Sequence, residues 1–415
     1  MTPSKYQVNA IHCDHRAGDD EVYAALQQVA APLQRSWEKL KAARRIWIKF
    51  NQDWPRPPRL FEGQHQELVS ERVTRATLRL LRENTHAELI AVDVSFFQAY
   101  ENARSDGSSW LANVLREFDA SYLDCNQPPK ARTPVPGGGL MFDYYFLPQS
   151  LSEVDAVVSV QKMKNHAFMG VTLCLKNLFG LLPTAAENVA DPLRRHRHYY
   201  HHLVRMPYML VDIGRIFNPT LNIIDGLVAQ ADREWDGEGR VADALIAGDH
   251  PIATDACGTY LMGHDPQADW LTPPFHRDRN PLKVGAESGW GSVNLQDIDF
   301  TSNLQPPLAE FHAQITDPLD RVISWRRTTA EQALYYRDHR QQFLDQYARQ
   351  YILLQQNEVR WHDPVGHLPG SRRKLAGDNP DEAMWLKYVD PDEDEGEHFE
   401  VYERTLQEIS NLHNS

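Results

Sequence analysis

Residues 154–183, VDAVVSVQKMKNHAFMGVTLCLKNLFGLLP, determine the fold of this chain and contain most of its unusual chemistry. The first seven of these residues, VDAVVSV, include four β-branched valines, which predicts a buried strand. The chain then places Lys162, Lys164, His166 and Lys176 in otherwise apolar surroundings. Burying a charged lysine or histidine costs free energy unless the group is paired or loses its charge. This segment is therefore where we expect a functional site.

Outward from this segment, predicted strands and helices alternate along the chain. The strands are predicted over residues 6–11, 45–50, 87–92, 120–123, 220–224 and 242–247, and the helices over residues 18–41, 66–84, 107–118 and 251–262. Such alternation is typical of βαβ units. It predicts an α/β fold with a mostly parallel sheet, helices on both faces and a helical C-terminal extension.

The order of these elements predicts three parts. An N-terminal α/β half covers residues 1–150, a second α/β half that carries the motif covers residues 151–300, and a helical, acidic extension covers residues 301–415. Within the extension, residues 328–360 are charged and predict a long helical stretch. The acidic run DPDEDEGE at 390–397 predicts a solvated segment.

Composition excludes several classes of function. A net charge of −14 argues against binding to nucleic acids or to an anionic membrane surface. The four cysteines are widely spaced and form no CxxC pair, which argues against a cysteine zinc site or a ferredoxin-type cluster. Neither a signal peptide nor an apolar run of membrane-spanning length is found, so a cytoplasmic protein is expected.

Ligands of open α/β sheets bind at the carboxyl ends of the strands. Lys49 and Asn51 end one predicted strand, and together with Lys162 and Lys164 they are expected to hold an anion. The alternative is that lysines at strand ends extend toward solvent, with no ligand.

Two further residues are expected to line this site. Asn177 directly follows Lys176, and Asp255 lies inside an apolar helix, where a carboxylate would need a cationic partner such as Lys176 or Lys49.

A resemblance to the domain of unknown function 362 family covers about residues 44–300. It is carried by IKFN at 48–51, the whole of 154–183, IIDGL at 223–227 and AGDHPIATDACGTYLMG at 247–263. The resemblance implies an α/β fold but no agreed activity. This chain has Asn165 where the family usually has threonine, and it lacks the ferredoxin-like cysteine module of some relatives.

A more distant likeness concerns the spacing of His166 and Lys176, which lie ten residues apart. This spacing is similar to that of the nickel-pincer lactate racemase family. The resemblance implies a histidine that acts as acid and base and a lysine that carries a nickel cofactor. The chain departs from that family by lacking a glycine pair before the lysine and an Arg-x-His-Arg segment.

The histidine-rich run RRHRHYYHH at 194–202 is a candidate metal site. His198 and His202 are four residues apart, so on a helix they would share one face. Imidazoles suit a transition metal such as zinc, nickel or iron. Anion binding by the arginines, or a plain basic surface helix, are the alternatives.

The function that these features favour is an enzyme acting on a small anionic substrate, a carboxylate. Lys176, with a pKa lowered by burial, would serve as base or covalent anchor, and His166 would move the proton. Epimerisation or redox chemistry beside a carboxylate is expected. The alternative is a non-catalytic protein that delivers a cofactor, metal or ligand to a partner, with Tyr335–Trp361 as the docking or self-association surface.

Overall fold

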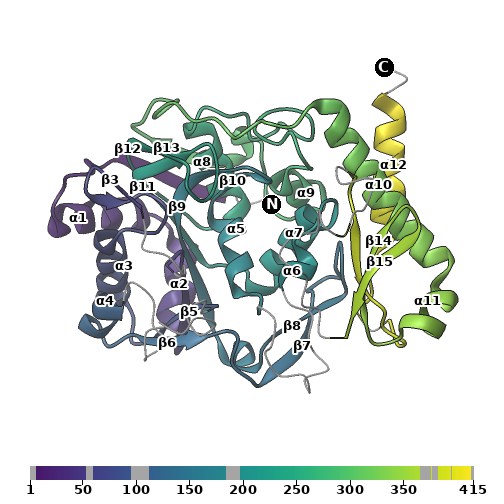
Figure 1. Ribbon diagram of the computed structural model, residues 1–415. Helices are drawn as coiled ribbons and strands as arrows, with labels where there is room; N and C mark the ends of the chain where they lie inside the picture. The colour runs from purple at the N-terminus through teal and green to yellow at the C-terminus, as the bar shows by residue number, and fades with distance from the viewer. Residues whose placement is uncertain are drawn as a thin grey trace.

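The computed structural model describes residues 6–52, 59–94, 112–183, 197–364, 375, 382–393 and 395–412. A nine-stranded sheet forms its centre, with helices on both sides (Figure 1). In spatial order the sheet contains β13 (Ile298–Ser302), β1 (Tyr6–His12), β12 (Glu238–Gly248), β11 (Leu221–Ala231), β9 (Ala156–His166), β2 (Arg45–Phe50), β5 (Glu88–Asp93) and β6 (Ser121–Asp124), with β10 (Gly170–Thr172) also paired to β9.

Strand direction divides this sheet into two parts. The neighbours β11, β9, β2, β5 and β6 are all parallel. In contrast, β12 is antiparallel to both β11 and β1, and β10 is antiparallel to β9. Helices cover both faces of the parallel part, which explains its nearly continuous apolar strands. The predicted α/β fold with a mostly parallel sheet is confirmed.

One face packs against α1 (Asp19–Ala30), α2 (Gln34–Ala42), α3 (Glu71–Asn84) and α4 (Ala112–Glu117) (Figure 1). The first turn of α3 is capped by Ser70 Oγ, which accepts a hydrogen bond from Val73 N at 3.3 Å. The single helix predicted over residues 18–41 is wrong. The chain forms α1 and α2 instead, because Pro32 lies between them and cannot donate a helical hydrogen bond.

The other face packs against α5 (Cys174–Asn177), α7 (Arg205–Phe217), α8 (Pro251–Leu261) and α9 (Pro281–Glu287), while α6 (Arg197–Tyr200) precedes α7. The N-cap of α8 is His250, whose Nδ1 accepts from Ile252 N at 3.2 Å. The preceding residue, Asp249, pairs with Arg35 at 2.6 Å.

The strands β11 and β12 are longer than predicted and form a hairpin of two 11-residue strands. A Cβ at Gly237 would lie 2.4 Å from Ala231 O, so the turn between these strands requires glycine at this position. Since Gln230 pairs with Lys164, the hairpin tip lies beside the carboxyl end of β9. Two small sheets complete this part of the chain, β3 (Leu60–Phe61) with β4 (Gln64–His65) and β7 (Lys130–Pro134) with β8 (Tyr144–Pro148).

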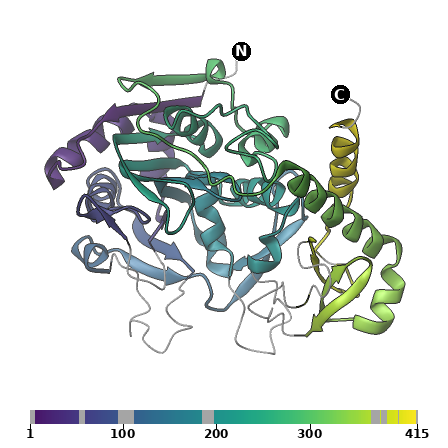
Figure 2. The same cartoon turned by 45° about the horizontal axis from the view of Figure 1, so that its top comes forward.

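The C-terminal extension lies on one side of the molecule (Figures 1 and 2). It contains α10 (Leu319–Asp338), α11 (Arg340–Tyr347), α12 (Glu400–Leu412) and a sheet in the order β15 (Glu358–Asp363), β14 (Tyr351–Gln355) and β16 (Trp385–Tyr388). Its helices were expected, but β14 and β15 form a hairpin where the predicted helical stretch 328–360 ends, so that end of the prediction is wrong. All five residues of β14 are buried between two neighbouring strands, which favours β structure over an exposed helix.

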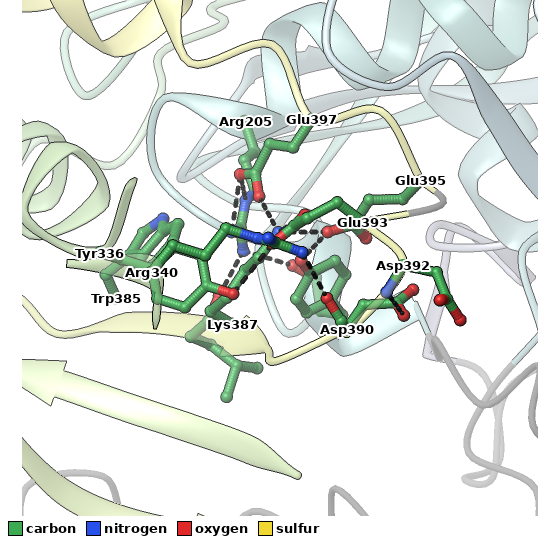
Figure 3. Close-up of polar contacts among 12 residues, drawn as sticks. Arg205, Tyr336, Arg340, Trp385, Lys387, Asp390, Asp392, Glu393, Glu395 and Glu397 are labelled. Atoms are coloured by element: carbon green, nitrogen blue, oxygen red, sulfur yellow. Dashed lines mark hydrogen bonds and ion pairs between the residues drawn. The ribbon is translucent and has the colours of Figure 1, made fainter. Parts of the chain in front are cut away.

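The acidic run at 390–397 is folded into this extension, so the predicted solvated segment is wrong (Figure 3). Lys387 of β16 forms ion pairs with Glu395 and with Glu397, the latter at 2.6 Å. Arg205 of α7 pairs with the same Glu397 at 2.8 Å. These contacts connect the extension to the central part of the fold, because α7 packs on the main sheet.

Candidate functional site

The carboxyl ends of β2 and β9 lie side by side, and the chain leaves these two strands toward opposite faces of the sheet. β2 leads to α3 on one face, and β9 leads through β10 to α5 on the other. The two strands are parallel, with Lys49 beside Ser159 and Phe50 beside Val160. Open α/β sheets bind ligands in the crevice at such a switch point.

Lys49 is buried at this edge of the sheet and already has a carboxylate partner. Its Nζ lies 2.7 Å from Asp93 Oδ2 and also donates to Phe50 O at 2.7 Å. Gly180 packs over it, since a Cβ there would lie 2.7 Å from Lys49 Cε. Lys49 therefore has an internal anion, Asp93, in the structure.

Asn51 ties the two strands together at their carboxyl ends. It is half-buried, and its Oδ1 accepts a hydrogen bond from Gln161 Nε2 of β9 at 3.1 Å. Its backbone N–H also donates to Val160 O at 3.0 Å.

Lys162, Lys164 and His166 lie on one face of β9, because side chains alternate along a strand. Lys162 is fully buried, and its Nζ lies 2.8 Å from Asp225 Oδ2 of β11. The same oxygen accepts a hydrogen bond from Ser70 N at 2.8 Å. Burial lowers the pKa of Lys162, and Asp225 opposes this effect.

Lys164 differs from both of these lysines, because no carboxylate in the described part of the chain forms an ion pair with it. Its Nζ donates to Glu67 O at 2.8 Å and lies 4.3 Å from the centre of the Trp235 ring. Burial lowers the pKa of Lys164 to about 7, and the charge of Lys176 acts in the same direction. Near pH 7, about half of the Lys164 amines are therefore uncharged.

His166 is a neutral imidazole whose tautomer follows from the β9–β10 hairpin. Its Nδ1 accepts hydrogen bonds from the backbone N–H groups of Phe168 at 3.0 Å and Met169 at 3.2 Å. The ring hydrogen therefore lies on Nε2. Burial lowers the pKa of His166 to about 3, so the ring remains an uncharged N–H donor across the physiological range.

Lys176 is only half-buried, so the deep burial predicted for it is wrong; the structure buries Lys164 instead. The Lys176 Nζ lies 4.3 Å from the centre of the Phe179 ring. Its charge is close enough to lower the pKa of both Lys164 and His166. Lys164, His166 and Lys176 thus form one cluster, with Lys176 at its solvent side.

Asn177 and Asp255 hold α5 in place. Asn177 Nδ2 donates to Lys49 O at 2.9 Å and to Ser159 Oγ at 3.0 Å. The carboxylate of Asp255 accepts hydrogen bonds of 2.8 and 2.7 Å from the first two N–H groups of α5. These N–H groups replace the cation that Asp255 was expected to need, and burial raises its pKa to about 7. Cys174 is buried, and burial raises the pKa of its thiol, as is typical of a packing residue.

The tip of the β11–β12 hairpin contributes Glu234 and Trp235, which sequence analysis missed. Glu234 Oε2 accepts from Ala167 N at 3.1 Å and lies 3.3 Å from His166 Nδ1. Burial acts to raise the pKa of Glu234, but His166, backbone N–H groups and Lys176 together lower it to about 2. The turn-forming residues in DREWDGEG (232–239) indicate a hairpin, but only strand pairing places it at the site.

The histidine-rich run reaches this cluster through His201. Its ring packs 5.3 Å from Phe168 and 5.5 Å from Phe179, measured between ring centres. The predicted pair His198 and His202 does not lie on one helix, because α6 ends at Tyr200 and His202 lies beyond it. His202 Nε2 accepts a hydrogen bond from Leu386 N of β16 at 3.3 Å. The side chain of His198 lies outside the described residues.

A different group has the spacing for a metal ion within the described ranges. It consists of Asp14, His15 and Asp243, whose nearest ligand atoms lie within 4.8 Å of one another. His15 Nδ1 lies 2.8 Å from Asp243 Oδ1, and the same oxygen accepts from His15 N at 2.7 Å. These hydrogen bonds hold a loop in place, and this structural role accounts for the group.

A cleft of 880 Å³ lies at the opposite end of the sheet, beside the amino ends of β9 and β11. Its walls include Ala156, Val157 and Phe217. The charged cluster described above is therefore separate from this cleft. None of the helices within the described ranges has the length and apolar character needed to span a lipid bilayer.

Among curated proteins, the chain is similar to the Thylakoid-associated protein sll1697 of Synechocystis sp., with 28% identity over 126 residues. The match covers 30% of this chain and 38% of the length of that relative. Among solved structures, it is similar to the lactate racemase apoprotein from Thermoanaerobacterium thermosaccharolyticum, with a TM-score of 0.36 and 15% identity. That match covers 62% of this chain and 56% of the other.

The model of one protein family matches residues 46–260, which is more than half of the 415 residues. The matched range includes β2, β9, α5, the β11–β12 hairpin and α8, and so all the elements that build the lysine–histidine cluster. The chain therefore belongs to the family described as Domain of unknown function (DUF362).

Proposed function

We propose that this protein is an enzyme that acts on a small carboxylate at the carboxyl end of β9. The observation that carries the proposal is the environment of Lys164. Within the described residues, this lysine is buried without the carboxylate partner that Lys49 and Lys162 each have. An unpaired buried amine destabilises a fold, and strongly perturbed titratable groups in a crevice are typical of functional sites.

The surrounding charges favour an anionic ligand. Lys176 is half-exposed at the edge of the cluster, and the charge of Arg277 also reaches His166. Arg277 itself is held by Asp317, whose Oδ2 accepts from its Nε at 2.6 Å. A carboxylate entering beside Lys176 would meet Lys164 and the Nε2–H group of His166.

The proposed chemistry is proton transfer at a carbon close to the substrate carboxylate. An amine with a pKa near 7 can act as a base or as a nucleophile at neutral pH. The neutral His166 can donate a hydrogen bond to a substrate oxygen and so polarise it without changing its own charge. Epimerisation at this carbon begins with such a step.

The test is hydrogen exchange with solvent. Short-chain 2-hydroxy and 2-oxo carboxylates are incubated with the protein in D₂O, binding is measured by calorimetry, and deuterium at carbon is measured by mass spectrometry. We expect at least one carboxylate to bind and to exchange faster than without protein. Exchange should be lost in Lys164→Met and Lys176→Ala and retained in Lys283→Arg, a partly exposed lysine paired with Asp269.

The other outcomes are equally informative. Binding without exchange for every carboxylate tested would favour a non-catalytic ligand-binding protein, the alternative function. Failure of all of them to bind would overturn the proposal of a carboxylate site.

A further inference from the structure

We propose that Lys164 forms a covalent imine with a small oxo acid, that is, a carboxylate that also carries a ketone or aldehyde group. This inference rests on the proposed function and extends it by naming the nucleophile and the substrate class. It assigns to Lys164 the covalent role that sequence analysis expected for Lys176.

The carboxylates of Glu67 and Glu234, which influence Lys164, accept hydrogen bonds from other groups. Glu67 offers Lys164 its backbone oxygen, while its side-chain Oε1 accepts a hydrogen bond from Asp236 N at 2.6 Å. Glu234 Oε2 accepts from Ala167 N at 3.1 Å. Both carboxylates influence Lys164 through space, but neither forms an ion pair with it. Among the residues that the structure describes, the amine is therefore surrounded by polar groups and has no fixed counter-ion.

The cations near this amine also favour imine formation. After burial, the charges of Lys176 and Lys162 both act to lower the pKa of Lys164. A lysine that is desolvated and lies next to other cations is the typical nucleophile for imine formation with carbonyl substrates. Lys162 cannot take this role in the same way, because its Nζ is held by Asp225 at 2.8 Å.

The neighbours of this amine suit the other parts of an oxo acid. Lys176 and Trp235 are partly exposed, whereas Lys164 is buried, and the Trp235 ring centre lies 4.3 Å from Lys164 Nζ. Lys176 would pair with the substrate carboxylate. The Nε2–H group of His166 would donate a hydrogen bond to the carbonyl oxygen, since its Nδ1 is held by two backbone N–H groups.

The step balances without an oxidant or reductant. The uncharged amine nitrogen attacks the carbonyl carbon, and a C–N bond forms. The carbonyl oxygen leaves as water and takes both amine hydrogens with it, so a C=N bond replaces the C=O bond. The imine withdraws electrons from the adjacent carbon and makes its C–H group more acidic, which is the proton chemistry proposed above.

Reductive trapping tests this inference directly. The whole protein is incubated with pyruvate or acetoacetate, reduced with sodium borohydride and mapped by peptide mass spectrometry. We expect close to one adduct per chain, located at Lys164, and a trapping rate that rises with pH around a midpoint near 7. The adduct should be lost in Lys164→Met and retained in Lys283→Arg.

Mapping on the unmodified sequence keeps the test valid even if the Lys164 variant does not fold. An adduct at Lys176, or adducts spread evenly over exposed lysines, would overturn the imine at Lys164. If carboxylates bind and exchange but no adduct forms at Lys164, the inference fails while the proposed function stands. If no carboxylate binds, the proposed function itself fails.

Discussion

Lys387 in the C-terminal extension and Lys164 in the central sheet are 0% and 1% exposed, yet their surroundings are opposite. Lys387 forms ion pairs with Glu395 and Glu397 (Figure 3), whereas Lys164 contacts a backbone oxygen and the Trp235 ring. Burial acts to lower the pKa of Lys387, but the two glutamates outweigh it and raise the pKa well above its usual value. For Lys164, burial prevails and lowers the pKa to about 7.

This comparison separates a structural lysine from a candidate chemical one. A charge that is neutralised by fixed carboxylates joins segments of the chain but cannot accept a proton near pH 7. A buried lysine without such partners lowers the stability of the fold. A function of the amine toward a ligand would explain why the protein keeps a residue with this cost.

The largest effect is expected at Lys387. Lys387→Met leaves Glu395 buried without its cation and Glu397 with Arg205 alone, so the free energy of unfolding should fall by about 3–5 kcal/mol in urea titrations. The matched control is Arg340→Met, which removes a partly exposed partner of Glu393 at 3.1 Å from the same acidic run and should cost under about 1 kcal/mol. Equal losses in both variants would contradict the comparison.

Lys164→Met is expected to change stability in the opposite direction. The pKa of lysine is 10.5 in the unfolded reference and about 7 in the folded protein, so between these values the unfolded state binds more protons. The stability of the parent protein therefore rises with pH in this range. The variant should lack this rise and should be more stable near pH 6, on the order of 2 kcal/mol. A variant that is less stable at that pH would show that Lys164 has a partner for its charge.

Lys176→Ala tests the role of Lys176 in ligand binding. Because Lys176 is half-buried and lies on the solvent side of the cluster, the change in the free energy of unfolding should stay within about 0.5 kcal/mol. Carboxylate affinity should fall by about tenfold or more, or 1.4 kcal/mol, in calorimetry. Lys176→Arg keeps the charge and should keep most of the affinity. Unchanged affinity in the alanine variant would remove Lys176 from the site.

The smallest effect concerns His398, which bridges Asp143 at 2.9 Å and Glu400 at 2.8 Å. Burial acts to lower the pKa of His398, but these two carboxylates raise it above 6.5. Its contribution is therefore complete below pH 6.5 and is lost as the pH rises through the folded-state value. His398→Gln should cost about 0.5 kcal/mol near pH 5.5 and nothing near pH 9. The same cost at both pH values would mean that the charge of His398 is irrelevant.

The amino-acid sequence determined the local and periodic features of this protein. The alternation of apolar strands and amphipathic helices predicted the α/β fold, because burial follows the periods of 2 and 3.6 residues. The same period of 2 placed Lys162, Lys164 and His166 on one face of β9. The polar residues at strand ends also pointed to the edge of the sheet where the lysine–histidine cluster lies.

Only the tertiary structure decided which buried lysine or arginine has a carboxylate partner. Asp93, Asp225 and Glu397 come from segments distant in sequence from Lys49, Lys162 and Arg205. For the same reason, the burial of Glu395 beside Lys387 and the position of Glu234 next to His166 could not be predicted from local patterns. The charge of a buried group depends on its three-dimensional neighbours, and chain folding brings those neighbours from any distance along the sequence.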